Sequence, residues 1–359
     1  MFSHTRSQGW LFAVCFISLL SLASCSTTTT TTPTTPSSMY QQTNLVADTA
    51  GFNAAIVDKT LINAWGISIG SSGVFWLSAN HSGVTDIYSA TGATQLPAIS
   101  VPSRDGISAG SPTGVIFNGT STQDFNNDKF IYCSEDGIIS GWNGSMKKEA
   151  TDPSTNAVYK GLALGTNGGN NYLYVADFKQ AKITVYDKNF TKTTLAGNFA
   201  DPTIPAGYAP FNVASIGGML YVAYAKQHTP PDNDDQSGVG NGYISIFKTD
   251  GTFVSRFASQ GVLNSPWGIA LAPGSFGDFS NAILVGNFGN GTINGFDSTG
   301  KSLGPLKDAN GAAISIDGLW GIMSFGANPP SASIPANSVY FTAGPGGENH
   351  GLFGYIKLK

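Results

Sequence analysis

Histidine, carboxylate and amide side chains lie at matching points of a unit that recurs along the chain. They follow the second predicted strand of their units, and the set comprises Asn80, His81, Glu135, Asp136, Asp177, Asn287, Glu348, Asn349 and His350. Imidazoles and carboxylates that meet on one face can hold a divalent metal such as zinc or calcium, or act as acid and base. We therefore take His81, Asp136, Glu348 and His350 as candidate metal ligands. The alternative is that these residue types serve only to form turns.

A second candidate site is formed by the residues that precede the small anchor residue of each unit. In chain order these residues are Trp65, Thr113, Lys160, Phe211, Trp267 and Trp320. Three tryptophans from neighbouring units predict an apolar wall with polar indole N–H groups, which suits a flat or sugar-like ligand. The ligand-binding candidates are Trp65, Lys160, Phe211, Trp267 and Trp320, together with His81, Asp177 and Asn287. The alternative is that the aromatic residues only pack between units and that Asp177 only caps its own turn.

Two acidic loops could bind calcium, because carboxylate oxygens are the ligands that this ion prefers. Pro230–Asp235 lies within an insertion at 226–241, which is expected to hang over the ligand face as a lid or to be a solvated loop tip. The second loop is Asp124–Asp128, and a similar segment, Asp278–Asn281, occurs at the same point of another unit. This recurrence favours a structural turn with a buried phenylalanine.

Catalytic residues cannot be assigned from motifs. The sequence contains neither a His-Glu-x-x-His zinc motif nor a Cys-x-x-Cys pair. The only thiol expected in the mature domain, Cys133, lies in an apolar strand pattern and is predicted to be a buried, inert residue.

The repeating unit predicts the architecture. Its anchors are 47 to 56 residues apart, and they are Gly66, Gly114, Gly161, Asn212, Gly268 and Gly321. Repeats of this length that contain only short strands are typical of propeller blades. Third strands are expected to end at Tyr88, Trp142, Tyr186, Phe247, Phe296 and Tyr355. Fourth strands are expected at Gln95–Val101, Thr194–Phe199 and Thr252–Phe257. We predict an all-β, six-bladed propeller.

The sixth unit has no room for a fourth strand after Tyr355. We expect Tyr40–Val46 to form the outer strand of that blade, which closes the ring and covers an exposed edge. The loops between second and third strands should share one face with the loops between blades. This face is expected to carry the ligand site.

Several long phrases resemble a known family: Phe130–Asn143, Tyr159–Asp187, Leu263–Asp297 and Leu319–Gly354. They are similar to an uncharacterised family of exported bacterial proteins related to NHL-repeat propellers, over residues 40–358. The resemblance implies a six-bladed fold and an exported location, but no catalytic residues. The phrase Tyr174–Asp177 also resembles gluconolactonase-type propellers, without their metal-binding set at matching positions.

The first 39 residues have the pattern of a lipoprotein leader. Residues 1–24 predict a signal peptide, Cys25 is the predicted lipidation site, and residues 25–39 form a Ser/Thr/Pro-rich tether before the domain at 40–359. The location implied is the bacterial cell envelope, with the outer membrane or cell surface favoured over the inner membrane. A net charge of −4 without a basic stripe makes nucleic acid an unsuitable partner.

Together these patterns favour a lipid-anchored binding or interaction module that is not an enzyme. Its partner would be a protein, a glycan or a small molecule, and the membrane would hold its lipid. The alternative is a metal-assisted hydrolase or lactonase with a site over the propeller channel.

Overall fold

The computed structural model describes residues 38–120, 123–230, 232–326 and 329–359. The predicted signal peptide, Cys25 and nearly all of the predicted tether lie outside these residues and stay predictions. In the part of the chain that is described, no helix combines the length and apolar character needed to cross a bilayer.

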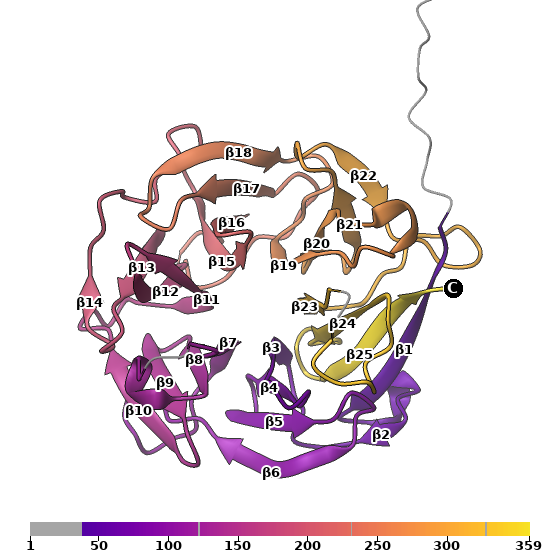
Figure 1. Cartoon of the computed structure of the whole chain (residues 1–359), viewed down its shortest axis with the longest axis horizontal. Coiled ribbons are helices and arrows are strands. Elements are labelled where there is room, and N and C mark those ends of the chain that lie inside the picture. Colours follow the sequence, from indigo (N-terminus) through magenta and orange to yellow (C-terminus); the bar gives the residue numbers. More distant parts are fainter. Residues whose placement is uncertain (1–37, 121–122, 231, 327–328) are drawn as a thin grey trace, which may run out of the picture. The chain divides into compact units, whose positions relative to one another are not determined.

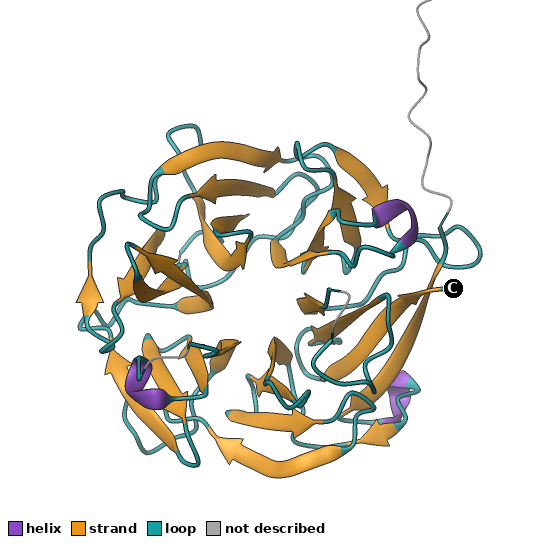
Figure 2. Cartoon of the chain, viewed as in Figure 1, coloured by secondary structure: helices purple, strands orange, loops and turns teal. Residues whose placement is uncertain are grey.

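Six small sheets surround a common centre and form a β-propeller, as predicted (Figures 1 and 2). Blades one to three comprise β3 (Ala64–Ile69), β4 (Phe75–Ala79), β5 (Val84–Tyr88), β6 (Thr94–Ser100); β7 (Pro112–Phe117), β8 (Phe130–Ser134), β9 (Ile138–Trp142), β10 (Met146–Thr151); and β11 (Tyr159–Asn167), β12 (Asn170–Asp177), β13 (Lys182–Tyr186), β14 (Lys192–Thr193). Blades four to six comprise β15 (Tyr208–Ile216), β16 (Met219–Lys226), β17 (Gly242–Phe247), β18 (Phe253–Ser259); β19 (Pro266–Leu271), β20 (Ile283–Asn287), β21 (Ile293–Phe296), β22 (Ser302–Pro305); and β23 (Leu319–Ser324), β24 (Ser338–Ala343), β25 (Leu352–Leu358), β1 (Tyr40–Ala47), β2 (Ile56–Val57).

Crowding at the centre explains the repeated anchor residues. A Cβ atom on Gly66 would lie 2.3 Å from the carbonyl oxygen of Thr113 on the next blade. A Cβ on Gly161 would lie 2.0 Å from Oδ1 of Asn212, whose amide in turn donates to the carbonyl of Trp267 at 2.8 Å. The innermost strands therefore approach so closely that a glycine, or an asparagine that bonds across, is required.

The N-terminal strand closes the ring, which confirms the prediction. Strand β1 pairs antiparallel with β25, from Tyr40 opposite Leu358 to Ala47 opposite Leu352. Val46 is fully buried, and the Tyr40 hydroxyl donates to the carbonyl of Phe276 on blade five at 2.7 Å. The short strand β2 adds a parallel fifth strand that the sequence analysis does not predict.

Two predicted strand positions are wrong. Thr194–Phe199 is not a strand, because the backbone N–H groups of Gly197 and Phe199 donate to Asp250 and Gly251 of blade four instead of to their own sheet. The fourth strand of blade three is therefore reduced to β14. The last strand, β25, also runs beyond Tyr355 to Leu358, since β1 provides it with partners along its whole length.

Three short 3-10 helices, η1 (Ala50–Phe52), η2 (Phe125–Asn127) and η3 (Gly277–Phe279), are the helices in the described residues. Helices η2 and η3 confirm the predicted structural turns, because the side chains of Phe125 and Phe279 are both fully buried. Cys133 is also fully buried, and burial raises the pKa of its thiol to about 12, as expected for an inert cysteine.

Strand β5 carries a buried carboxyl group that should make stability depend on pH. Burial raises the pKa of Asp86 to about 7, the Thr60 hydroxyl opposes this shift by donating at 2.8 Å, and Asp58 adds to it. The folded state then binds more protons than the unfolded state between about pH 4 and pH 7, so the free energy of unfolding should fall as pH rises through this window. In Asp86→Asn this fall should be smaller, measured by urea denaturation at pH 5 and pH 7.5. An equal fall in both proteins would contradict the prediction.

Candidate functional site

Three tryptophans from blades five, six and one pack into a single cluster near the centre of the ring. The rings of Trp65 and Trp320 stack with centroids 3.6 Å apart, and Trp267 meets both rings edge-on at 6.4 and 6.0 Å. All three side chains are at least 95% buried. The tryptophans are therefore brought together as predicted, but their ring faces mostly cover one another. Their role as ligand-binding residues stays a prediction.

Two of the three indole N–H groups connect this cluster to polar residues of neighbouring blades. Trp267 Nε1 donates to the carbonyl of Lys160 at 2.9 Å, and Trp320 Nε1 donates to Asn63 Oδ1 at 2.8 Å. Trp267 also lines a hollow of about 310 Å³ at the ring centre, which is otherwise lined by the innermost strands. Trp267 thus contacts both this hollow and the backbone of Lys160.

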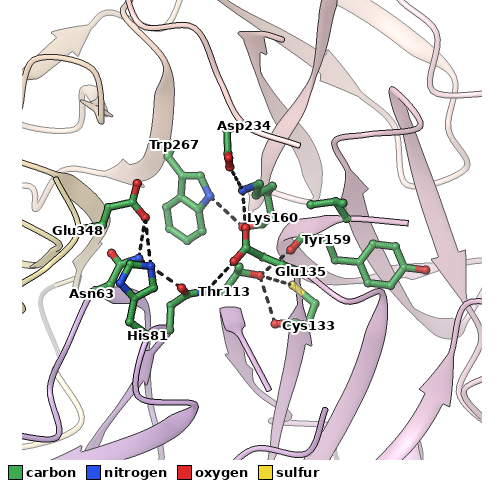
Figure 3. Close-up of polar contacts among 12 residues, drawn as sticks. Asn63, His81, Thr113, Cys133, Glu135, Tyr159, Lys160, Asp234, Trp267 and Glu348 are labelled. Atoms are coloured by element: carbon green, nitrogen blue, oxygen red, sulfur yellow. Dashed lines mark hydrogen bonds and ion pairs between the residues drawn. The ribbon is translucent and has the colours of Figure 1, made fainter. Parts of the chain in front are cut away.

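Loops of several blades carry a continuous hydrogen-bonded arc, which we call the polar arc (Figure 3). Its members are Glu348, Asn63, Asn80, Glu135, Lys160 and Asp234. Asn63 Nδ2 donates to Glu348 Oε2 at 2.7 Å and to Asn80 Oδ1 at 3.3 Å, and Asn80 Nδ2 donates to Glu135 Oε2 at 3.0 Å. The arc joins blade six to blades one, two, three and four. It confirms that loops between second and third strands share a face with loops between blades.

The buried ammonium of Lys160 is the centre of this arc. Lys160 is 1% exposed, and its Nζ donates to Glu135 Oε1 at 2.6 Å and to Asp234 Oδ1 at 2.8 Å. The same Nζ lies 5.0 Å from the centroid of the Trp65 ring. Burial alone would lower the pKa of Lys160, but the two carboxylates raise it above its usual value. Lys160 therefore stays charged at every physiological pH.

The loop at 226–241 contributes Asp234 to the polar arc, and its role as a lid stays a prediction. Asp234 extends from this loop to Lys160 although its own side chain is 75% exposed. The neighbouring Asp235 accepts hydrogen bonds from the hydroxyls of Ser237 and Ser265. Two of the three carboxylates in the predicted calcium loop thus bind an ammonium and two hydroxyl groups of the protein itself.

The structure does not bring the four candidate metal ligands together. His350 Nδ1 lies 2.8 Å from Asp48 Oδ2, and Asp136 accepts from the backbone N–H of Arg104. His81 Nε2 lies 4.0 Å from Glu348 Oε2, and this pair alone reaches the polar arc. Among the residues that the structure describes, no three His, Cys, Asp or Glu side chains are arranged to hold a metal.

The other ligand candidates are engaged in local structure. Asp177 accepts from the backbone N–H groups of Val158 and Gln180, and burial raises its pKa to about 6. Asn287 is fully buried; its Oδ1 accepts from the N–H of Asn264, and its amide donates to the carbonyl of Val262. Phe211 packs against Trp320 with centroids 5.8 Å apart. Asp177 and Asn287 therefore stabilise turns and take no part in the polar arc, as the turn interpretation expected for Asp177.

Sequence reasoning missed Asn63, which holds both Glu348 and Trp320. The signal available in the sequence was its position directly before Ala64-Trp65-Gly66. In the structure the φ of Asn63 is 51°, which places this residue in a turn. It also missed two short pattern matches, Gly106–Gly110 to the hydrolase pattern Gly-x-Ser-x-Gly and Gly295–Ser302 to a phosphate-binding loop. Both segments lie in turns and strand ends without the following helix that either motif needs.

The two carboxylates on Lys160 should differ in their contribution to stability. Glu135→Gln should lower the free energy of unfolding by roughly 2 kcal/mol or more, because a fully buried ammonium loses its inner partner. Asp234→Asn should lower it by less than about 1 kcal/mol, because the Asp234 carboxylate is mostly exposed. Urea denaturation at pH 7 measures both values, and Asp234→Asn serves as the matched control. A larger loss in Asp234→Asn than in Glu135→Gln would contradict this description of the arc.

Two viral proteins are similar to the chain over most of its length. "Uncharacterized protein R648" of Acanthamoeba polyphaga mimivirus is 35% identical over 320 residues, which cover 84% of this chain and 76% of the relative. "Uncharacterized protein L690" of the same virus is 34% identical over 297 residues and covers 78% of each chain. No family model matches the chain. These relatives do not support the predicted membership of an exported bacterial family.

Solved structures share the fold at low sequence identity. A streptogramin B lyase is 14% identical, with a TM-score of 0.53, over 89% of this chain and 97% of the other. Regucalcin, a calcium-binding protein from Agrobacterium tumefaciens, is 14% identical, with a TM-score of 0.51, over 83% of this chain and 90% of the other. At this level of identity the likeness supports the propeller fold alone.

Proposed function

The chain belongs to the family of the mimivirus proteins R648 and L690, and we propose that it is a binding module for a small cationic ligand. The ligand would bind on the face that carries the polar arc. Its positively charged amine groups would meet the carboxylates of Glu348, Glu135 and Asp234.

The charge balance of the polar arc is the observation that carries this proposal. The arc contains three carboxylates and one ammonium, of which Glu135 and Asp234 contact Lys160 and Glu348 contacts Asn63, so the arc has more acidic than basic groups. The side chains of Glu135 and Glu348 are 28% and 32% exposed, so both can reach a ligand. Burial raises the pKa of Glu348, and an approaching cation would relieve the cost of its charge.

The arc is also organised before any ligand binds. Asn63 and Asn80 donate to Glu348 and Glu135, so these amides fix one oxygen of each carboxylate. A ligand that binds prepositioned carboxylates loses less free energy to ordering than one that binds mobile side chains. The tryptophan cluster also positions Asn63, because Trp320 Nε1 donates to its Oδ1 at 2.8 Å.

Thermal unfolding with amines tests the proposal. We expect spermidine or cadaverine to raise the Tm by a few degrees at saturating concentration, and neutral sorbitol at the same concentration to raise it less. Glu348→Gln should weaken amine binding at least tenfold, because it removes the charge but keeps an oxygen for Asn63. Glu149→Gln on the outer strand β10 is the matched control, since it makes the same change in net charge.

Two outcomes would contradict the proposal. One is that neither amine raises the Tm more than sorbitol does. The other is that Glu348→Gln and Glu149→Gln weaken binding equally, which would indicate a general charge effect.

Added salt should weaken specific amine binding, since the carboxylates are partly exposed.

A second candidate function is acid–base catalysis by His81 and Glu348. Their Nε2 and Oε2 atoms lie 4.0 Å apart, and both belong to loops on the same face. Streptogramin B lyase shows that an enzyme can share this fold. Turnover of a substrate that is lost in both His81→Ala and Glu348→Gln would favour this function over binding alone.

Export and lipid anchoring stay part of the proposal, and they are supported by the leader pattern at residues 1–39. We expect the protein to take up radiolabelled palmitate when it is expressed in a bacterium. Cys25→Ser should abolish the label while the secreted domain stays folded. Equal labelling of both proteins would contradict lipidation at this residue.

A further inference from the structure

A second cleft lies between blades one and two, away from the polar arc. It has a volume of about 790 Å³, within the range of small-molecule sites. Its lining comes from the β3–β4 turn, the β7–β8 loop and the β9–β10 turn, together with residues of the strands beside them. In a propeller these turns lie on the face opposite the loops that carry the arc. The cleft is therefore a separate site.

One wall of the cleft is aromatic. Trp76 lies between Phe130 and Trp142, with ring centroids 4.2 and 4.5 Å from its own, and Phe117 packs on Phe130 at 5.4 Å. Trp76 and Phe130 are 4% exposed, whereas Trp142 and Phe117 are only partly buried. The buried pair thus supports two aromatic rings that remain accessible in the cleft. Such rigid, partly exposed rings bind ligands that have an apolar face.

The rim of the cleft is polar but nearly without charge. Exposed hydroxyl and amide side chains line it from both blades, among them Ser72, Gln95, Asn127 and Asn143. An entirely apolar ligand such as a lipid would leave these groups without hydrogen-bond partners, which costs free energy. The charged residues of the lining are Asp128 and Lys129, too few for a phosphate or a polyamine.

Asp128 adds a third feature. It is 2% exposed, and its Oδ2 has no hydrogen-bond partner within the described residues. Burial raises the pKa of this carboxyl to about 7, and the neighbouring Glu149 adds to the shift. The charge of Asp128 is thus reduced near pH 7, and Lys129 is the other charged residue of the lining, so the cleft suits an uncharged ligand.

We propose that this cleft binds a neutral saccharide, with a sugar ring stacked on the exposed part of Trp142 and its hydroxyl groups bonded to the amides of Gln95 and Asn143. A sugar combines an apolar ring face with a periphery of hydroxyl groups, and this combination matches the aromatic wall and the polar rim. The site is independent of the polar arc and of the function proposed for it.

Saturation-transfer NMR of the full chain with neutral hexasaccharides tests the proposal. The probes are cellohexaose, hexa-N-acetylchitohexaose, maltohexaose and xylohexaose, each at up to 10 mM. We expect at least one to bind, and Trp142→Ala to weaken that binding at least tenfold. Trp142→Phe should retain most of it, because it keeps an aromatic ring. Glu348→Gln, on the opposite face, should leave it unchanged.

Three results would overturn the proposal. They are the failure of all four saccharides to bind, binding that is unchanged in Trp142→Ala, and binding that is lost in Glu348→Gln, which would place the sugar at the polar arc. Circular dichroism checks that each variant is folded. If Trp142→Ala does not fold, the double variant Gln95→Ala/Asn143→Ala decides the question, since both side chains are exposed and their loss should weaken binding about tenfold.

Discussion

The pairing of β1 with β25 is the interaction on which the rest of this structure depends. Each blade of a propeller packs on two neighbours, so the ring is stable only if the last blade is complete. Blade six obtains its outer strand from the opposite end of the described chain. The pairing extends over the whole of β1, with one irregularity between Asn44 and Val46. Tyr40 extends this contact to blade five through its hydroxyl.

Closure also determines the geometry of the polar arc. Asn63 comes from the start of blade one, and Glu348 and Trp320 come from blade six, yet Asn63 bonds to both. These contacts exist only while blades one and six stay adjacent. The arc and the tryptophan cluster are therefore consequences of the closed ring, and they add hydrogen bonds across the joint between the two ends of the chain.

The architecture could be predicted because it depends on local and repeated constraints. The same crowding acts on Gly66, Gly161 and the three other glycine anchors, so the pattern recurs in the sequence. The clustering of Trp65, Trp267 and Trp320 followed from their equivalent positions on adjacent blades. The repeat also indicated that Tyr40–Val46 completes the last sheet, and β1 does pair with β25.

The contacts of the candidate site could not be predicted, because they join residues far apart in sequence. Lys160 and Asp234 are 74 residues apart, and only the folded path of the 226–241 loop brings them together. Asp48 and His350 are also far apart in sequence, and their contact pairs His350 with Asp48 instead of with the other expected metal ligands. Thr194–Phe199 has the residue pattern of a strand, but the neighbouring blade competes for its backbone. The residue pattern of a segment does not show which of two sheets its backbone N–H groups will bond to.

Hydrogen exchange of the β1 amides tests the central claim most directly. If β1 is an integral strand of the ring, the amides of residues 41–47 that pair with β25 should exchange only through global unfolding, at the same free energy as those of β24. Mass spectrometry of peptides that cover Tyr40–Ala47 and Ser338–Ala343 gives both values in one experiment. Fast exchange in β1 while β24 stays protected would contradict the account, because the ring would then hold together without its N-terminal strand.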